Sequence, residues 1–291
     1  MKILQLTDIH LTSPGKTILG RDPILNFELA LNDAFKNHND IEALIISGDL
    51  SDWGEKADYE FLKEKISKLT VPTYLCIGNH DDREIFSKIF PNFVNDEGFV
   101  QYHKSFSEGN GIFLDTWGPE THAGFFCKKR ADWLDKTLSD LENQCFIFMH
   151  HNPIPTYIIP TDKIMLLDTT YLEQVLRKYK EKVKHIFFGH CHMPLSGSFC
   201  GIPVSAPRGT NHAGYPNFSE KYLLSASYLP ESYSVIIYNE PSVTVHMVEF
   251  GYKGDIIVEG SPDYASWDKG CLLYTSPSPR DNSGSRMPSS A

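Results

Sequence analysis

Short apolar runs typical of buried β-strands recur along the chain. They lie at residues 3–6, 43–46, 74–77, 146–149 and 186–188. Between the first three runs, apolar residues recur at helical spacing over residues 24–35 and 59–69. Strands that alternate with helices predict parallel pairing and right-handed crossovers. The pattern therefore predicts a β-α-β-α-β unit at the start of an α/β domain.

The later part of the chain changes from helical to strand-type patterns. Helices are predicted over residues 130–141 and 171–179, where leucines recur every three or four positions. After Gly189, short β-type runs broken by Gly, Pro and Ser follow at 198–206, 222–227, 233–238, 243–250 and 255–258. Apolar and polar residues alternate over 242–248, which predicts that these runs form a second, more antiparallel sheet.

The end of the chain differs in texture from the rest. Residues 271–291 are rich in Ser and Pro, and the codons TGT CTC TTA TAC ACA TCT, which would encode residues 271–276, resemble the adapter of a transposase-based sequencing library. We expect a disordered, translated adapter here, with a genuine Ser/Pro-rich tail as the alternative. Residues 1–250 are then expected to form one domain, and residues 251–270 a last hairpin or the start of a truncated cap.

The charge balance bears on the class of partner. The chain has 27 basic and 37 acidic side chains, a formal net charge of −10. An acidic protein without a long basic or aromatic surface run is a poor binder of nucleic-acid polymers and of anionic membranes. Small molecules are therefore the expected substrates, and several of the carboxylates are candidate ligands for cations.

The cysteines and the apolar runs bear on the compartment. Five cysteines precede the C-terminal stretch, at 76, 127, 145, 191 and 200, without a C-x-x-C spacing. This odd number predicts reduced thiols in a cytoplasmic setting. The apolar run after Lys2 is interrupted at Gln5, so we expect no signal peptide, and no run approaches the length of a membrane span.

Five motifs rich in metal-ligating residues follow the five apolar runs. They are Asp8-Ile9-His10, Gly48-Asp49-Leu50-Ser51-Asp52, Gly78-Asn79-His80-Asp81, His150-His151 and Gly189-His190-Cys191-His192. A lone Asp after a strand is most often a cap or turn residue. Here, however, every motif falls at the carboxyl end of a strand, where α/β sheets place their chemistry. Carboxylate, imidazole and amide groups bind hard or borderline divalent metals, so the set predicts a two-metal hydrolase.

The order of these motifs resembles that of the calcineurin-like metallophosphoesterase superfamily, over residues 1–250. Three details resemble its class III cyclic-nucleotide phosphodiesterases and glycerophosphodiesterases. These are D-x-H close to the start of the chain, the doubled histidine in Met149-His150-His151-Asn152-Pro153, and Leu19-Gly20-Arg21-Asp22 after the first strand. The resemblance implies a four-layer αββα sandwich of two mixed sheets flanked by helices.

The resemblance also implies which residues bind each of the two metals. The first metal would be held by Asp8, His10, Asp49 and His192, and the second by Asp49, Asn79, His150 and His190, so that Asp49 bridges the pair. Mn²⁺ and Fe²⁺ are the expected metals, with Zn²⁺ as an alternative. Two such metals share a hydroxide that attacks phosphorus in line.

Other residues of the motifs are given supporting roles. By resemblance, His80 stabilises charge on the phosphoryl group or protonates the leaving oxygen. Asp81 and Asp52 would orient His80 and the ligands through hydrogen bonds, although Asp52 is equally well read as a loop cap. For His151, a structural role is favoured over contact with the substrate. Cys191 is expected to point away from the metals rather than to ligate them as a thiolate.

Three residues outside the motifs are weaker candidates for substrate contact. Asn211 and His212 lie in a Gly-rich loop that follows the last motif. Arg21 follows the first strand and could pair with a phosphate oxygen, with a surface salt bridge as the alternative.

The leading hypothesis is a binuclear metal-dependent phosphodiesterase. Its substrate would be a small soluble diester, either a 3′,5′-cyclic nucleotide such as cAMP or a glycerophosphodiester. A phosphomonoesterase or protein phosphatase with the same site is one alternative, and an inactive scaffold of this fold is another. A scaffold would be expected to have lost ligands, whereas every ligand position is filled here. The sequence leaves the oligomeric state open.

Overall fold

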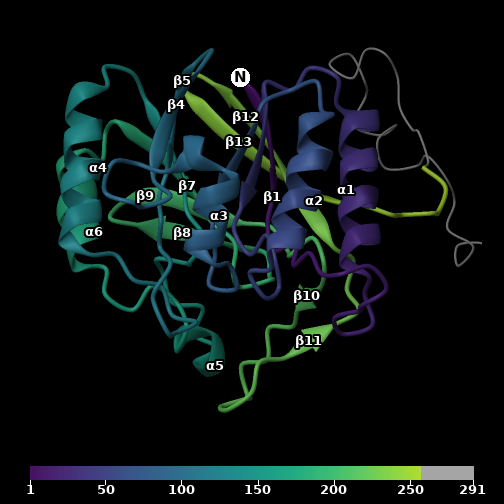
Figure 1. The fold of residues 1–291 in the computed structure, drawn as a ribbon. Coiled ribbons are helices and arrows are strands. Elements are labelled where there is room, and N and C mark those ends of the chain that lie inside the picture. Colours follow the sequence, from purple (N-terminus) through teal and green to yellow (C-terminus); the bar gives the residue numbers. More distant parts are fainter. Residues whose placement is uncertain (257–291) are drawn as a thin grey trace, which may run out of the picture. The chain divides into compact units, whose positions relative to one another are not determined.

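Alternation along the strands directs side chains into two different cores. In the computed structural model, which describes residues 1–256, two β-sheets pack face to face and helices cover their outer faces (Figure 1). Ile3 of the first strand and Ile45 of the second point between the sheets, whereas Leu4 and Leu44 point toward the helices. The predicted αββα sandwich is confirmed.

The first sheet has the strand order β13-β12-β1-β2-β3. Its strands are β1 (Lys2–Leu6), β2 (Ala43–Ser47), β3 (Thr73–Cys76), β12 (Ser232–Asn239) and β13 (Ser242–Glu249). The pairs β1·β2 and β2·β3 are parallel, as the β-α-β-α-β pattern predicts. Strand β12 pairs antiparallel with β1, and β13 pairs antiparallel with β12.

The second sheet has the order β4-β5-β6-β7-β9-β8. Its strands are β4 (Tyr102–Phe106), β5 (Gly109–Phe113), β6 (Cys145–Phe148), β7 (Val183–Phe187), β8 (Leu195–Phe199) and β9 (Ile202–Ala206). The central pairs β5·β6, β6·β7 and β7·β9 are parallel, and the outer pairs β4·β5 and β8·β9 are antiparallel. A separate short ribbon joins β10 (Ala213–Gly214) to β11 (Ala226–Ser227).

The helices divide between the two outer faces. They are α1 (Pro23–Asn37), α2 (Lys56–Ser67), α3 (Arg83–Ile89), the 3₁₀ helix η1 (Pro91–Phe93), α4 (Lys128–Asp140), α5 (Ile159–Asp162) and α6 (Thr170–Lys178). Side chains of α1, α2 and α3 pack with the first sheet, and those of α4 and α6 with the second. Two of the helices begin at an aspartate cap. Asp22 accepts a hydrogen bond from the amide of Leu25 in α1, and Asp82 accepts one from the amide of Ile85 in α3.

Several predicted elements differ from the observed ones. Apart from the short β10·β11 ribbon, the strands after Gly189 extend the two main sheets instead of forming one of their own. Strand β9 pairs with β7 and β8 with β9, while β12 pairs with β1 and β13 with β12. The run 198–206 is a hairpin that turns at Cys200 and Gly201, both with positive φ. Of the run 222–227, only Ala226–Ser227 is a strand, and α3, β4 and β5 were not predicted at all.

Two further expectations concern the end of the chain. Residues Met1–Gly251 form one compact unit. The predicted strand 255–258 and the hairpin or cap over 251–270 extend beyond the described residues, and the adapter-like stretch 271–291 lies wholly outside them. Within residues 1–256, no helix has the length and hydropathy needed to cross a bilayer.

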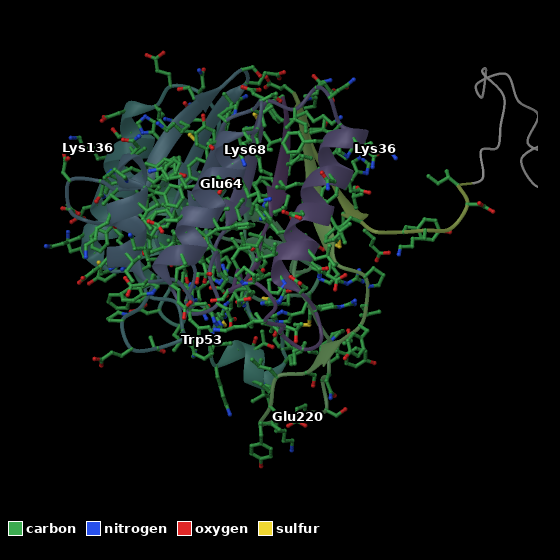
Figure 2. The ribbon with its side chains drawn as sticks, turned by 45° about the vertical axis from the view of Figure 1, so that its right-hand side comes forward. Lys36, Trp53, Glu64, Lys68, Lys136 and Glu220 are labelled. Carbon is green, nitrogen blue, oxygen red and sulfur yellow. The ribbon has the colours of Figure 1, made fainter. Side chains whose placement is uncertain are left out.

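The loops at the carboxyl ends of the strands gather at one end of the sandwich. In Figure 2, Trp53 from the loop after β2 and Glu220 from the loop between β10 and β11 lie at the lower end of the molecule. Lys36, in the last turn of α1, and Lys68, which follows α2, lie at the opposite end. All five predicted motifs follow strands that point toward the lower end, where the candidate chemistry is concentrated.

Candidate metal centre

An unusual backbone conformation marks the loops that carry the motifs. Five residues that are not glycine have positive φ there: Asp8 at 54°, His10 at 46°, Asp49 at 48°, His190 at 68° and His192 at 52°. The left-handed region costs an L-residue about 1–2 kcal/mol. Strain of this kind clusters at functional sites, because the surrounding structure must hold it in place.

The first ligand group combines Asp8, His10, Asp49 and His192. One ligand atom from each of these lies within 4.8 Å of the others. The Nε2 atoms of His10 and His192 are 3.2 Å apart, and His192 Nε2 lies 3.4 Å from Asp8 Oδ1. His10 Nε2 lies 3.6 Å from Asp49 Oδ2. All four side chains predicted for the first metal are therefore together.

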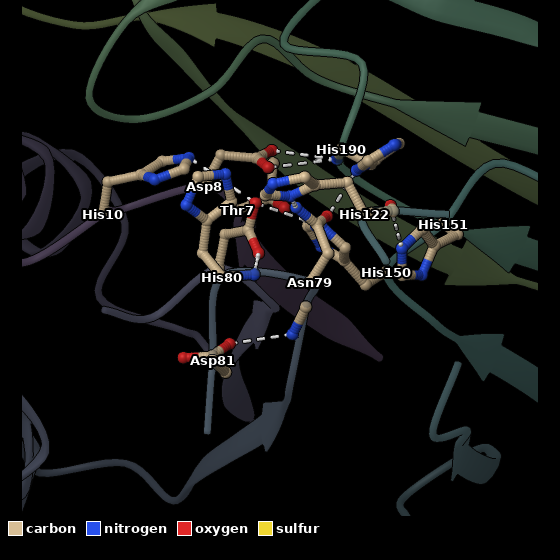
Figure 3. Close-up of polar contacts among 12 residues, drawn as sticks. Thr7, Asp8, His10, Asn79, His80, Asp81, His122, His150, His151 and His190 are labelled. Atoms are coloured by element: carbon tan, nitrogen blue, oxygen red, sulfur yellow. Dashed lines mark hydrogen bonds and ion pairs between the residues drawn. The ribbon is translucent and has the colours of Figure 1, made fainter. Parts of the chain in front are cut away.

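The second ligand group shares Asp49 with the first. It brings Asp49, His150 and His190 within 4.8 Å of one another. His150 Nε2 lies 3.3 Å from Asp49 Oδ2, 3.2 Å from the Asn79 side-chain oxygen and 3.3 Å from His190 Nδ1 (Figure 3). The four side chains predicted for the second metal thus converge, with Asp49 between the two groups.

Hydrogen bonds at the outer nitrogens fix how the histidine rings point. His10 Nδ1 donates to Asp52 Oδ1 at 3.0 Å, His192 Nδ1 to the carbonyl of His212 at 3.0 Å, and His150 Nδ1 to the carbonyl of Ser47 at 2.9 Å. In a neutral ring the lone pair is then on Nε2. These three lone pairs face the carboxylates at the centre, which is how metal-ligating histidines are usually oriented.

Gly78 leaves room for this convergence. A Cβ atom at this position would lie 2.2 Å from Asp49 Oδ1 and 2.6 Å from His150 Nε2. Any side chain would therefore displace the shared carboxylate or the imidazole beside it. The glycine of the Gly78-Asn79-His80-Asp81 motif is required by close approach to the centre.

The donor set fits divalent metals. Two buried carboxylates, three inward-facing Nε2 lone pairs and an amide oxygen meet in one place, and acceptors so close repel each other unless a cation lies among them. His190 adds a buried Nε2 that has no hydrogen-bond partner within the described residues. Oxygen and imidazole ligands suit Mn²⁺, Fe²⁺ and Zn²⁺ alike, so the set fits a metal pair without selecting one element.

The buried charges shift the pKa values of the ligands in opposite directions. Burial opposes charge on Asp49, but the neighbouring His150, His80 and His10 outweigh it and hold the pKa of this carboxyl well below its usual value. Burial likewise lowers the pKa of His150, but the Asp49 carboxylate raises it to about 9 overall. For His190, burial and the neighbouring histidines lower the pKa well below the usual value. In the absence of metal, a proton on His150 therefore balances the charge of Asp49.

Metal binding is consequently expected to release protons. Below pH 9 the metal-free His150 carries a proton that a metal must displace, so affinity should fall as the pH falls, by about tenfold per pH unit for one proton. Calorimetry of Mn²⁺ binding at pH 6.5, 7.5 and 8.5, in buffers with different ionisation enthalpies, counts these protons. Affinity independent of pH, with no proton released, would contradict the assignment of His150 as a ligand.

His80 lies beside the two ligand groups rather than within them. Its backbone amide donates to Asp49 Oδ1 at 2.9 Å, and its Nδ1 donates to the carbonyl of Asp52 at 2.9 Å. The ring is partly exposed and lines a cavity of about 550 Å³ that also borders the ligand groups. His80 Nε2 is thus the nitrogen available to a molecule in the cavity, as expected for a residue that acts on substrate.

The Asp81 carboxylate hydrogen-bonds to backbone amides and not to the His80 ring. This differs from the expectation that Asp81 orients that ring. Its carboxylate accepts hydrogen bonds from the amides of Leu50, Ser51 and Gly78 and from the hydroxyl of Tyr59. Burial, with a further contribution from the Asp49 charge, raises its pKa to about 6. Asp81 therefore ties together the loops after β2 and β3. Asp52 is the residue that contacts both rings, His10 through its carboxylate and His80 through its carbonyl.

His151 and Cys191 both point away from the ligand groups. The ring of His151 is buried, with Nδ1 2.7 Å from the Thr116 hydroxyl and Nε2 donating to the carbonyl of His122 at 3.2 Å. This is the structural role that the sequence favours. Cys191 packs in the core under the second sheet, where burial raises the pKa of its thiol well above the usual value. None of the ligand groups found within residues 1–256 includes Cys191.

The three weaker candidates for substrate contact lie in different environments. His212 lines the cavity and its ring lies 4.1 Å from that of His192. Asn211 is fully buried and its carbonyl accepts from Asn26, so the loop is packed rather than mobile as its glycines suggest. Arg21 forms an ion pair with Glu231 at 2.8 Å, the alternative to phosphate contact.

Sequence reasoning missed His122. This exposed residue lines the cavity, and its Nδ1 lies 2.9 Å from the side-chain nitrogen of Asn79. No apolar run directly precedes it, so it lacks the signal that marks the five motifs. Apolar residues from three separate loops, among them Leu19, Ile158 and Leu224, form the wall of the same cavity and were missed for the same reason.

Comparison with known proteins decides the family. Residues 1–194 match the model of the calcineurin-like phosphoesterases. The chain belongs to this family. It is therefore a phosphoesterase, and the prediction of a phosphoric ester hydrolase is confirmed.

Relatives also support the resemblance to class III cyclic-nucleotide phosphodiesterases. A protein of Rhodopseudomonas palustris named as a probable cyclic nucleotide phosphodiesterase is 32% identical over 261 residues, which cover 88% of this chain and 95% of that one. The 3′,5′-cyclic adenosine monophosphate phosphodiesterase of Escherichia coli K12 is 25% identical over 214 residues, covering 72% and 76%.

Solved structures share the fold at low sequence identity. A dimetal phosphatase from Danio rerio superposes with a TM-score of 0.65 at 13% identity, over 86% of this chain and 97% of that one. This likeness supports the sandwich architecture alone, since identity at this level carries no information on substrate.

Proposed function

We propose that this phosphoesterase is a binuclear metal-dependent phosphodiesterase that hydrolyses a 3′,5′-cyclic nucleotide such as cAMP. The observation that carries the proposal is the pair of ligand groups joined at Asp49, with His80 beside them in the lining of the same cavity. Two relatives whose names refer to cyclic nucleotides support the choice of substrate.

The residues of the site have different roles in the proposed reaction. When bound, the two metals would supply a water of lowered pKa and polarise the phosphoryl group. The chain itself contributes Asp49 to hold both positions and His80 to act on the phosphoryl group. As the oxygen of the attacking water bonds to phosphorus and the P–O bond to one ribose oxygen breaks, that ribose oxygen takes a proton from His80 Nε2. Asp52, whose Oδ1 lies 3.6 Å from His80 Nδ1, would stabilise the protonated ring.

The size and lining of the cavity support a small substrate with one polar and one apolar part. Its volume of about 550 Å³ is within the usual range for small-molecule sites of about 300–1,000 Å³. Its apolar wall includes Leu19, Ile158 and Leu224. Its polar lining includes His80 and five of the predicted ligands, namely His10, Asp49, Asn79, His190 and His192. A cyclic nucleotide has this division, with a charged phosphodiester at one end and a planar base at the other.

A metal-reconstituted substrate panel tests the proposal. It compares 3′,5′-cyclic AMP and GMP, glycerophosphocholine, bis-p-nitrophenyl phosphate and p-nitrophenyl phosphate. We expect the cyclic nucleotides to give the highest kcat/KM. A preference for glycerophosphocholine would move the assignment to glycerophosphodiesters, and a preference for the monoester would move it to phosphatases.

Leu224 offers a direct test of the apolar wall. It lines the cavity, whereas its neighbour Leu223 does not, and both side chains are exposed. Leu224→Ala should remove about 1 kcal/mol of apolar contact with the base and raise KM for cAMP about fivefold with little change in kcat. Leu223→Ala is the matched control and should leave both constants unchanged. Equal effects of the two substitutions would show that the base does not contact this wall.

The compartment we propose is the cytoplasm. The five cysteines of residues 1–256 are all free thiols. Free thiols on both buried and partly exposed positions support a reducing environment.

A further inference from the structure

Asn79 faces two different partners through the two ends of its amide. Its oxygen lies 3.2 Å from His150 Nε2, and its nitrogen lies 2.9 Å from His122 Nδ1 (Figure 3). Only the oxygen can ligate a metal, whereas the NH₂ group can only donate hydrogen bonds. A rotation of the amide by half a turn would therefore present a donor to the ligand group and remove one ligand from the second metal position.

We propose that His122 is a positioning residue for the second metal position. Its Nδ1 accepts a hydrogen bond from the Asn79 NH₂ group, and this contact keeps the Asn79 oxygen directed at His150 Nε2. The contact requires that the proton of a neutral His122 is on Nε2. The proposal rests on the metal-dependent reaction proposed above, but it concerns metal affinity rather than substrate.

The hydrogen bonds of His150 support this orientation of the amide. With a metal bound, the His150 ring is neutral. Its Nδ1 donates to the carbonyl of Ser47, which can only accept, so Nε2 then carries the lone pair. With the Asn79 oxygen opposite, two acceptors converge as metal ligands do. With the NH₂ group opposite, Asn79 would instead donate to His150 Nε2 and compete with the metal for it.

The loop that carries His122 is firmly anchored. The carbonyl of His122 accepts from the buried ring of His151, which is held in turn by Thr116. Arg130 is also buried and donates to the carbonyls of Asp115 and Trp117. The backbone of residues 115–122 is therefore fixed from the core, while the His122 side chain itself is exposed and can be replaced without disturbing that core.

Mn²⁺ titration of the metal-free protein tests the proposal without any substrate. His122→Ala removes the acceptor and should weaken the second Mn²⁺ site about 10- to 100-fold, the usual scale for a group that supports a ligand. His122→Asn places an amide oxygen close to the position of Nδ1 and should keep the affinity within about threefold. His103→Ala, at an exposed position on β4, is the control and should bind as the wild type does.

A double variant tests whether His122 acts by orienting the Asn79 amide. In Asn79→Asp both ends of the side chain are oxygens, so its rotation no longer matters, and adding His122→Ala should change the second affinity by less than about threefold. The proposal is overturned if His122→Ala binds two Mn²⁺ as tightly as the wild type, or if His122→Asn loses as much affinity as His122→Ala. It is also overturned if the wild type binds only one Mn²⁺. A protein that binds two Mn²⁺ with the expected variant pattern but does not cleave cyclic nucleotides would refute the proposed substrate alone.

Discussion

Replacement of Asp49 by Asn should lower turnover by several orders of magnitude and reduce the bound metal below two equivalents. The Asp49 carboxylate is shared by both ligand groups, with Oδ2 3.3 Å from His150 Nε2 and 3.6 Å from His10 Nε2. An amide of the same shape removes the negative charge that both cations need and offers one oxygen where two were available. Both metal positions should therefore weaken together, which no other single ligand can cause.

Metal analysis and steady-state kinetics of Asp49→Asn check this expectation. Asp82→Asn is a matched control, since it makes the same change nearby at the N-cap of α3, where Asn caps as well as Asp does. The control should keep two metals and normal turnover. An Asp49→Asn variant with two metals and a near-normal rate would refute the shared-ligand assignment.

Replacement of His80 by Ala should lower turnover of cAMP about 10²- to 10⁴-fold while both metals stay bound. The side chain of His80 contacts Asp52 and the cavity, and only its backbone amide, which alanine retains, reaches Asp49. Metal content is therefore expected to separate His80 from the ligand residues.

The leaving group distinguishes the two roles considered for His80. A ribose alkoxide needs a proton as it leaves, whereas nitrophenolate needs very little. If His80 is the acid, the loss of turnover in His80→Ala should be much smaller for bis-p-nitrophenyl phosphate than for cAMP. Equal losses for both substrates would assign His80 to charge stabilisation, and loss of metal would make it a ligand.

The ligand groups were predictable from sequence because their signals are local. Each apolar run ends in a motif, and parallel strands carry their carboxyl ends to one edge. Asp8 and His10 are two residues apart, as are His190 and His192, so each pair needed only one strand end to be placed correctly. The structure brings together all the side chains whose placement depends on this rule.

The parts that sequence did not predict depend on contacts between distant segments. Strands β12 and β13 join β1 rather than β9, a choice set by packing across the whole chain. Strand β5 has the sequence Gly-Asn-Gly-Ile-Phe and is buried throughout. Its two glycines and its asparagine are untypical of a buried strand, so the sequence does not predict it. His122 and Asp81 owe their roles to partners brought close by folding, and no residue next to them in sequence indicates those partners.

The central claim is that the site joined by Asp49 hydrolyses a cyclic nucleotide with two metals. The most direct measurement is the rate of cAMP hydrolysis by metal-free protein as Mn²⁺ is added in known equivalents. We expect no turnover without metal, a rise as Mn²⁺ is added, and saturation at two equivalents per chain. Full activity after exhaustive chelation, saturation at one equivalent, or no cAMP hydrolysis at two would contradict the account.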